Sequence, residues 1–269
     1  MTAATRLLYL DLIKKTLTCT VYEGLDGSLW IPKNRLQRLL VGLVVPTEVR
    51  LSQAADINQR REGREWPVLA QTMIGLNRLD HLQYCVERVL TDDVSGDLIE
   101  AGVWRGGATI FMRALLKAYG VADRCVWVAD SFAGLPPPDA AEYPADAGDC
   151  LFREKSLAVS LEQVRANFER YNLLDDQVRF LRGWFKDVLP AAPIDKLAVI
   201  RLDGDMYEST VDSLTHLYPK LQPGGFLVVD DYGAVPGCRQ AVHDYRLQHG
   251  ITEEIERIDW TGAFWRRSR

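Results

Sequence analysis

The sequence predicts an α/β fold built on a mostly parallel sheet, and three observations lead to this prediction. Short apolar runs alternate with amphipathic helical segments from about residue 96 onward, the pattern of strands joined by helical crossovers. The run at 226–229, Phe-Leu-Val-Val, is apolar throughout, as expected for a strand buried on both faces. The segment 253–268 has Thr261-Gly262 between aromatic-rich arms and no following helix, which predicts a C-terminal antiparallel hairpin.

The elements of the sheet follow one another along the chain. Helices are expected at 108–120, which ends at Gly120 as helices commonly do, and at 160–172, where Ser160 and Gln163 fit a capping box. Strands are expected at 97–102, 125–131, 177–185, 197–205 and 224–232. Together with the two arms of the hairpin, these strands give a seven-stranded sheet.

The first 90 residues have a different pattern. They are helical in character, with a long helix expected from Pro67 to Leu90, because proline is favoured at the start of a helix. The polar stretch 51–67 contains Gly63 and reads equally well as a lid or as a solvated linker. We therefore expect an N-terminal helical and lid region at 1–90 and the main domain at 91–269, together forming one compact unit.

Composition and charge exclude several classes of protein. The formal net charge of −5 gives no general case for binding nucleic acid or an anionic membrane. The basic end, Arg266, Arg267 and Arg269, is expected to be solvated rather than a binding arm. Five widely spaced cysteines without a C-x-x-C pair argue against zinc and disulfide frameworks. No signal peptide or membrane-spanning run is recognisable, so a cytoplasmic location is expected.

Acidic residues follow the predicted strands. Ligands of open parallel sheets bind at the carboxyl ends of the strands. Four of the five strand ends are acidic, which helix capping alone does not explain; the residues are Glu100, Asp130, Asp203, and the pair Asp230 and Asp231. The last three form an oxygen-only group suited to Mg²⁺, which would relieve their repulsion. Asp205 and Glu208 are weaker candidates, and the four histidines fit structural roles.

The loop after the first strand favours a particular cofactor. Gly102, Gly106 and Gly107 form a G-x-x-x-G-G loop, where the backbone can approach a ligand closely. Glu100 would repel a pyrophosphate but can bind an ammonium group, and Asp130 stands where an acid accepts hydrogen bonds from ribose. A nucleoside that carries an amino acid satisfies both, which means S-adenosylmethionine. A nicotinamide oxidoreductase and a non-catalytic binding protein remain as competing readings, although both leave Asp230 and Asp231 unexplained.

Long blocks of the chain resemble the macrocin and mycinamicin sugar O-methyltransferases and the noviose 4-O-methyltransferase of aminocoumarin biosynthesis. The resemblance covers most of 66–269, and its motifs include EAGVWRGGATIFMRALLKAYG, VWVADSFAGLP and LAVIRLDGDMYESTVDSLTHLYPKLQPGGFLVVDDY. The motifs GREWP and DGDMYEST are nearer to the noviose enzyme. The resemblance implies a class I (Rossmann-like) fold, S-adenosylmethionine, Mg²⁺, a homo-oligomer, and methylation of a deoxysugar hydroxyl on a glycosylated natural product in antibiotic biosynthesis.

The resemblance also implies roles for individual residues. Asp203 matches the general base and a metal ligand, and Asp230 and Asp231 match the other metal ligands. Trp66 matches an aromatic residue in the lid over the substrate. The cofactor would be bound by residues from four segments: Met73, Glu100, Gly102, Asp130, Ser131, Gly183, Trp184 and Phe185.

Two segments depart from the family pattern. Residues 139–158 lack an expected histidine-containing stretch, and 27–45 match poorly, so acceptor contacts do not transfer there. Within the methyltransferase class, the alternative acceptor is a phenolic or catechol hydroxyl, because similar three-carboxylate metal sites also serve such substrates.

Overall fold

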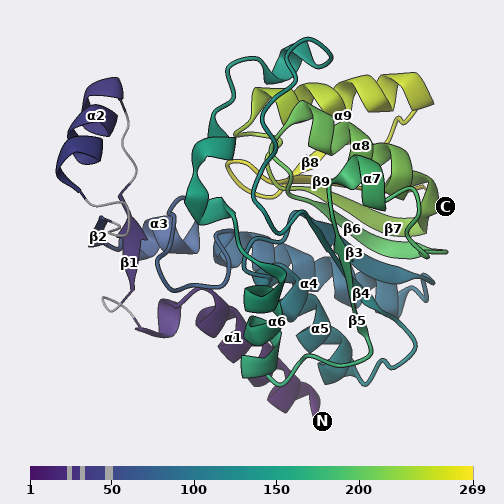
Figure 1. The fold of residues 1–269 in the computed structure, drawn as a ribbon. Coiled ribbons are helices and arrows are strands. Elements are labelled where there is room, and N and C mark those ends of the chain that lie inside the picture. The colour runs from purple at the N-terminus through teal and green to yellow at the C-terminus, as the bar shows by residue number, and fades with distance from the viewer. Residues whose placement is uncertain (23–25, 31–33, 46–50, 269) are drawn as a thin grey trace.

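A seven-stranded sheet forms the centre of the protein, in the order β5-β4-β3-β6-β7-β9-β8 (Figure 1). The structure is a computed structural model that describes residues 1–22, 26–30, 34–45 and 51–268. The expected seven strands and their mostly parallel arrangement are confirmed. The strands are β3 (Asp97–Ala101), β4 (Val126–Asp130), β5 (Val178–Arg182), β6 (Leu197–Leu202), β7 (Leu221–Val229), β8 (Glu256–Arg257) and β9 (Ala263–Arg266).

The order of the strands reverses between β3 and β6. The chain runs outward from β3 through β4 to β5, and then returns to place β6 and β7 on the other side of β3. All pairs among these five strands are parallel, whereas β9 pairs antiparallel with both β7 and β8. Such a reversal opens a crevice at the carboxyl ends of the strands, where ligands of this class of sheet bind.

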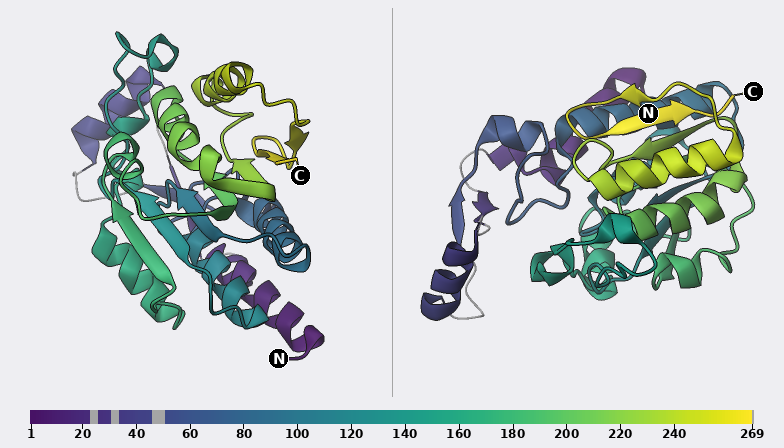
Figure 2. Two further views of the ribbon diagram at one scale, coloured as in Figure 1. Left: turned by 90° about the vertical axis from the view of Figure 1, so that its right-hand side faces the viewer. Right: turned by 90° about the horizontal axis from the view of Figure 1, so that it is seen from above.

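Helices cover both faces of the sheet, which gives three layers (Figures 1 and 2). One face packs against α4 (Gly75–Thr91), α5 (Gly107–Tyr119) and α6 (Leu161–Arg170), and α1 (Ala3–Leu17) packs on the outer side of α5 and α4. The other face packs against α7 (Phe185–Val188), α8 (Tyr207–Leu217) and α9 (Pro236–His249). The expected helix ends are confirmed, since Gly120 is left-handed at φ +70° and Ser160 caps α6 at the Gln163 amide.

The expected helix start at Pro67 is wrong, because α4 begins at Gly75. Pro67 instead lies in an extended segment that pairs with β1 (Gly27–Leu29). The Leu29 amide donates to the Trp66 carbonyl at 2.6 Å, and the Val68 amide donates to the Gly27 carbonyl at 3.0 Å. Proline has no amide hydrogen to give, but this pairing uses only the neighbours of Pro67.

The segment 51–66 is more regular than the expected loop. It contains β2 (Ser52–Ala54), which pairs with β1, and α3 (Ile57–Arg61). Arg60 anchors it, because its buried guanidinium binds Asp26 at 2.6 Å and Glu65 at 2.9 Å. Helix α2 (Arg35–Val44) comes between β1 and β2 in the sequence and stands apart from the three layers (Figure 2).

The C-terminal hairpin is confirmed, and two of its arginines are partly solvated and also form contacts within the protein. Arg266 pairs with Asp92 and covers the Phe226 ring, and Arg267 donates to the carbonyls of Leu221 and Tyr218. Arg269 lies outside the described residues. No helix in the described part of the chain has the length and apolarity needed to cross a membrane. Short 3₁₀ helices complete the structure: Thr20–Tyr22, Pro144–Asp146, Leu151–Arg153, Lys155–Leu157 and Tyr218–Lys220.

Candidate active site

The three carboxylates expected to bind metal meet at the carboxyl ends of β6 and β7. Asp203, Asp230 and Asp231 each place an oxygen within 4.8 Å of the others. The main chain fixes two of them, because the Asp203 amide donates to Ala101 of β3 and the Asp230 amide donates to Leu202 of β6, both at 2.8 Å. The parallel pairing of β6 with β7 therefore brings together residues that are up to 28 positions apart in the sequence (231 − 203).

A fully buried arginine lies directly beneath these carboxylates. Arg201 is 1% exposed and forms ion pairs with Glu100, Asp203 and Asp230, the Asp203 pair at 2.7 Å. Glu100 and Arg201 are direct neighbours across β3 and β6. Glu100 is thus held within the sheet, with a side chain that is only 2% exposed. Burial raises the pKa of Glu100 to about 8, in spite of the opposing effect of Arg201.

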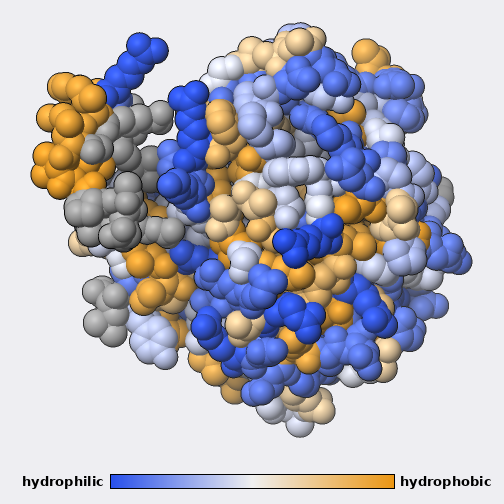
Figure 3. Space-filling view, viewed as in Figure 1, coloured by the Kyte–Doolittle hydropathy of each residue, from blue (hydrophilic) through white to orange (hydrophobic). Residues whose placement is uncertain are grey.

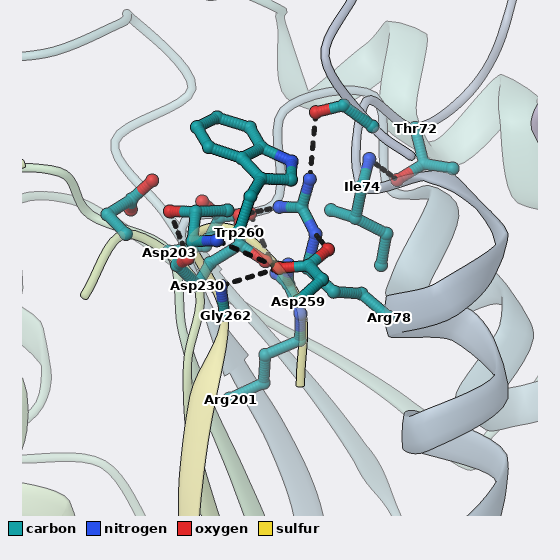
Figure 4. A network of polar contacts seen from close by, with 12 residues as sticks. Thr72, Ile74, Arg78, Arg201, Asp203, Asp230, Asp259, Trp260 and Gly262 are labelled. Atoms are coloured by element: carbon teal, nitrogen blue, oxygen red, sulfur yellow. Dashed lines mark hydrogen bonds and ion pairs between the residues drawn. The ribbon is translucent and has the colours of Figure 1, made fainter. Parts of the chain in front are cut away.

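A second buried arginine, Arg78 of α4, approaches Asp230 from the other side (Figure 4). It also binds Asp259 at 3.0 Å and the Gly63 carbonyl at 2.9 Å. Burial alone would raise the pKa of Asp230, but Arg201 and Arg78 outweigh it and hold that pKa below its usual value. The charge of Asp230 is therefore already compensated by two guanidinium groups, which the sequence did not predict.

Three carboxylates at the site have less compensation. The pKa of Asp203, Asp205 and Asp231 is raised, first by burial and then by the neighbouring carboxylates. Asp205 adopts a left-handed backbone at φ +60°, and its amide donates to Asp231 at 3.2 Å. This group of partly buried carboxylate oxygens is a donor set that fits a hard divalent cation such as Mg²⁺. The other weak candidate, Glu208, pairs with Lys186 at 3.0 Å.

A cavity of about 320 Å³ opens beside the carboxylates, along the ends of β3, β4 and β5. Asp130 lies on its wall and accepts hydrogen bonds from the amides of Val103 and Phe132, each at 2.7 Å and each at a different oxygen. Oδ1 also accepts a longer hydrogen bond from the Ser131 hydroxyl at 3.4 Å. A carboxylate acceptor on the cavity wall suits the hydroxyls of a ribose. Seven of the eight residues expected to bind cofactor line this cavity: Met73, Gly102, Asp130, Ser131, Gly183, Trp184 and Phe185.

The glycines of the loop after β3 serve the protein's own packing. A Cβ on Gly102 would lie 1.9 Å from the Asp203 carbonyl oxygen, and one on Gly107 would lie 2.5 Å from the Gln71 carbonyl oxygen. Close approach to a ligand is therefore not what excludes larger residues at these two positions. Gly102 brings the end of β3 against the residue expected to act as base.

A second cavity, of about 160 Å³, adjoins the first on the other side of Asp203. Trp66 lines it, together with Asp203, Asp230 and Asp231. Glu100, the eighth residue expected to bind cofactor, lies here rather than on the first cavity. Its Oε2 is buried and has no hydrogen-bond partner among the described residues, which fits a cationic ligand group that approaches from the cavity.

The sequence analysis missed Arg201 and Arg78. The sequence does contain a signal for Arg201, which is the one charged residue in β6, a strand whose six positions are all buried. A buried charge requires partners of opposite charge, so ion pairs could have been predicted for it. Arg78 lies on the buried face of α4 beside Leu79 and Leu82. Two of the histidines have the structural role expected for them. The ring centres of His81 and Phe264 lie 4.1 Å apart, and those of His249 and Tyr245 lie 4.0 Å apart.

Comparison with known proteins identifies the family. The family model "Macrocin-O-methyltransferase (TylF)" matches residues 6–267. A tetracenomycin-rhamnoside 4'-O-methyltransferase of Streptomyces olivaceus is 54% identical over 269 residues, which cover 100% of this chain and 95% of that protein. The mycinamicin III 3''-O-methyltransferase of Micromonospora griseorubida is 50% identical and covers 97% of this chain and 96% of its own.

A solved structure agrees with the sequence matches. The O-methyltransferase NovP superposes with a TM-score of 0.86 at 49% identity, and the match covers 98% of this chain and 100% of that one. The chain is thus an O-methyltransferase with the class I fold of S-adenosylmethionine-dependent enzymes, and it belongs to the macrocin O-methyltransferase family.

Proposed function

We propose that the protein transfers a methyl group from S-adenosylmethionine to a sugar hydroxyl of a glycosylated natural product in antibiotic biosynthesis, with the help of Mg²⁺. The observation that supports this most strongly is that Asp203 lines both cavities. A cofactor in the larger cavity and an acceptor in the smaller one would meet at this carboxylate.

In this proposal, the cofactor binds along the ends of β3, β4 and β5. Asp130 accepts hydrogen bonds from the ribose. The methionine part extends past Met73 and Asp203, which line both cavities, so that its ammonium group reaches the unpaired Oε2 of Glu100 on the smaller cavity. The bound cofactor supplies an electrophilic methyl group on a sulfonium. Trp184 and Phe185 give the cavity apolar walls, and such walls exclude water from the reacting groups.

Asp203, Asp230 and Asp231 would hold Mg²⁺, and the ion would make the acceptor hydroxyl more acidic. Asp203 takes the proton from the acceptor oxygen as that oxygen bonds to the methyl carbon, the bond between this carbon and the sulfonium breaks, and S-adenosylhomocysteine leaves. The strand end places its carboxylate rigidly, and burial together with Asp230 raises its pKa. A carboxylate of raised pKa is a better proton acceptor than an ordinary one.

The nature of the acceptor is inferred from the relatives. The two enzymes compared above are named for the 4' position of a tetracenomycin rhamnoside and for the 3'' position of mycinamicin III. The sugar is what these acceptors share, because their aglycones differ. A phenolic or catechol hydroxyl remains the alternative, and it would need no sugar.

An acceptor panel separates the two possibilities. Purified protein is incubated with S-adenosylmethionine, Mg²⁺ and one of four acceptors: the tetracenomycin rhamnoside, mycinamicin III, a noviosylated aminocoumarin, or catechol. NMR of the product locates the new methyl group. A methyl group on a sugar oxygen supports the proposal, whereas methylation of catechol alone supports the alternative. Separate thermal shifts with S-adenosylhomocysteine and with NAD check the cofactor class.

We further propose that 1–90 forms a lid and assembly region for the catalytic residues of 91–269, and that the protein is a homo-oligomer. The support is an apolar surface on α2 (Figure 3), where Leu36, Leu39, Leu43 and Val44 are each more than 60% exposed. Exposed apolar patches of this kind are typical of protein interfaces.

Light scattering of the wild type and of the Leu39→Asp/Leu43→Asp variant tests the homo-oligomer. A monomeric wild type would contradict it.

A further inference from the structure

We propose that the loop between β8 and β9 forms a wall of the acceptor cavity, in which Trp260 contacts the acceptor and Arg78 positions the wall. This inference rests on the proposed function, because it takes the smaller cavity as the acceptor site. Trp260 lines that cavity together with Trp66, Arg64 and the carboxylates. An acceptor in this cavity whose hydroxyl reaches Asp203 would therefore lie within reach of the two tryptophans.

Trp260 joins the C-terminal loop to the lid. Its indole nitrogen donates to the Glu62 carbonyl at 2.9 Å, and the Arg64 guanidinium lies 4.5 Å from the centre of its ring. Both partners belong to the segment that leads into Trp66. The lid and the C-terminal loop, almost 200 residues apart in the sequence (260 − 62 = 198), thus form one continuous surface.

The loop itself is held in a single conformation. Asp259 accepts hydrogen bonds from the amides of Thr261 at 3.0 Å and Gly262 at 2.8 Å. The Thr261 hydroxyl donates to the main-chain carbonyl of Asp230 at 2.9 Å. The position of Trp260 is consequently tied to the main chain that carries the metal-site carboxylates.

Arg78 connects all the parts of this wall, as Figure 4 shows. Its three nitrogens reach three segments: Nη1 donates to Asp230, Nε to Asp259 at 3.0 Å and Nη2 to the Gly63 carbonyl at 2.9 Å. The guanidinium is planar and rigid, so these three partners have fixed positions relative to one another. Lysine could keep the charge but not all three directed bonds.

The chemistry of the wall fits a glycosylated acceptor. Aromatic side chains offer large apolar surfaces with few rotatable bonds, and they commonly line sites for small molecules. A deoxysugar or a flat aglycone presents an apolar face that can pack on an indole ring. Trp260 would therefore set which acceptors fit, while Asp203 carries out the chemistry.

Two substitutions of Trp260 distinguish a direct contact with the acceptor from a structural link to Glu62 alone. Trp260→Phe keeps an aromatic ring but loses the donor to Glu62, whereas Trp260→Ala loses both. With the acceptor found by the panel, Trp260→Ala is expected to raise the acceptor KM by about 10-fold or more, the scale of one aromatic contact. The kcat and the affinity for S-adenosylhomocysteine should stay within about 3-fold of wild type on the same scale. Trp260→Phe should raise KM much less.

Trp184→Ala is the matched control, because this tryptophan lines the cofactor cavity instead. It should weaken S-adenosylhomocysteine binding measured by calorimetry. An unchanged acceptor KM in Trp260→Ala overturns the contact. Equal rises in the Phe and Ala variants also overturn it, because they would reduce Trp260 to a tether.

Hydrogen exchange tests the wall without any acceptor. Arg78→Lys should speed exchange of the amides at 62–66 and at 259–262 together, and Trp260→Phe should speed it at 62–66. Arg88→Lys, on the same helix but paired with Asp92 at the surface, should change neither segment. Unchanged exchange in Arg78→Lys overturns the positioning role. If the wild type methylates none of the acceptors, the proposed function fails, while this measurement still decides on the wall.

Discussion

Two arginines determine which carboxylates at the strand ends carry uncompensated charge. Arg201 and Arg78 both bind Asp230, whereas Asp205 and Asp231 form no ion pair with a described residue. Charge repulsion is therefore concentrated around Asp203, Asp205 and Asp231. Asp230 would act as a pre-positioned ligand whose geometry is already fixed without a metal ion.

Removing Arg201 should destabilise the fold. Arg201→Met keeps most of the side-chain volume but leaves Glu100 and Asp230 without this partner in a buried site. Breaking a buried ion pair in this way lowers the free energy of unfolding by about 3–5 kcal/mol. Arg88→Met, which breaks an exposed pair, should cost about 1 kcal/mol or less. Urea denaturation measures both, and equal small effects would mean that Arg201 is not a structural counter-charge.

Asp203→Asn should separate chemistry from cofactor binding. The change keeps the size of the side chain but removes its charge and basicity, so kcat should fall by about 10²-fold or more, the scale of general-base catalysis. Affinity for S-adenosylhomocysteine should stay near that of wild type. Asp205→Asn is the control, because asparagine also tolerates the left-handed backbone at this position. Normal turnover in Asp203→Asn with loss in Asp205→Asn would assign the base to Asp205.

At the scale of elements, the segment 51–66, which we propose to be a lid, has a base fixed by ion pairs and an end that borders the smaller cavity. Arg60 ties α3 to Asp26 and Glu65 through buried ion pairs. Residues 57–61 should therefore show slow hydrogen exchange even in the free protein. Exchange at 63–66 should slow further when S-adenosylhomocysteine and acceptor bind, because these residues border the smaller cavity. Equal exchange at 63–66 in the free and bound protein would show that no closure occurs.

Helix α4 should make stability depend on pH through His81. Burial lowers the pKa of His81 to about 4, against about 6.5 when exposed. Below pH 6.5 the unfolded chain binds the proton and the folded chain does not, so stability falls as the pH falls from 6.5 to 4. The slope contributed by this residue approaches about 1.4 kcal/mol per pH unit. His81→Gln should flatten the curve over this range, and an unchanged slope would contradict the assignment.

At the scale of the molecule, periodicity was enough to predict the sheet but not the tertiary pairings. The apolar runs of β6 and β7 and the turn at Thr261-Gly262 have local signals, and the rule that strand ends meet located Asp203, Asp230 and Asp231. The helix start predicted at Pro67 was wrong because Pro67 is held in an extended conformation by pairing with β1, some 40 residues earlier (67 − 28 = 39). Local sequence patterns do not predict a pairing over this distance.

The contacts of three buried arginines could not be predicted from local sequence patterns for the same reason. Arg60, Arg78 and Arg201 are each defined by partners from other elements, and only Arg201 carries a warning, as a charge within a buried strand. These contacts decide which carboxylates are compensated. The chemistry of the site was therefore predictable in kind, while the distribution of charge within it required the structure.

The measurement that tests the central claim most directly is the dependence of sugar methylation on metal. Protein is treated with EDTA, supplied with methyl-deuterated S-adenosylmethionine and a glycosylated acceptor, and titrated with Mg²⁺, while NMR follows the product. The account predicts no turnover in EDTA, recovery as Mg²⁺ is added, and the label on a sugar oxygen. Full turnover in excess EDTA, or a label that appears only on the aglycone, would contradict it.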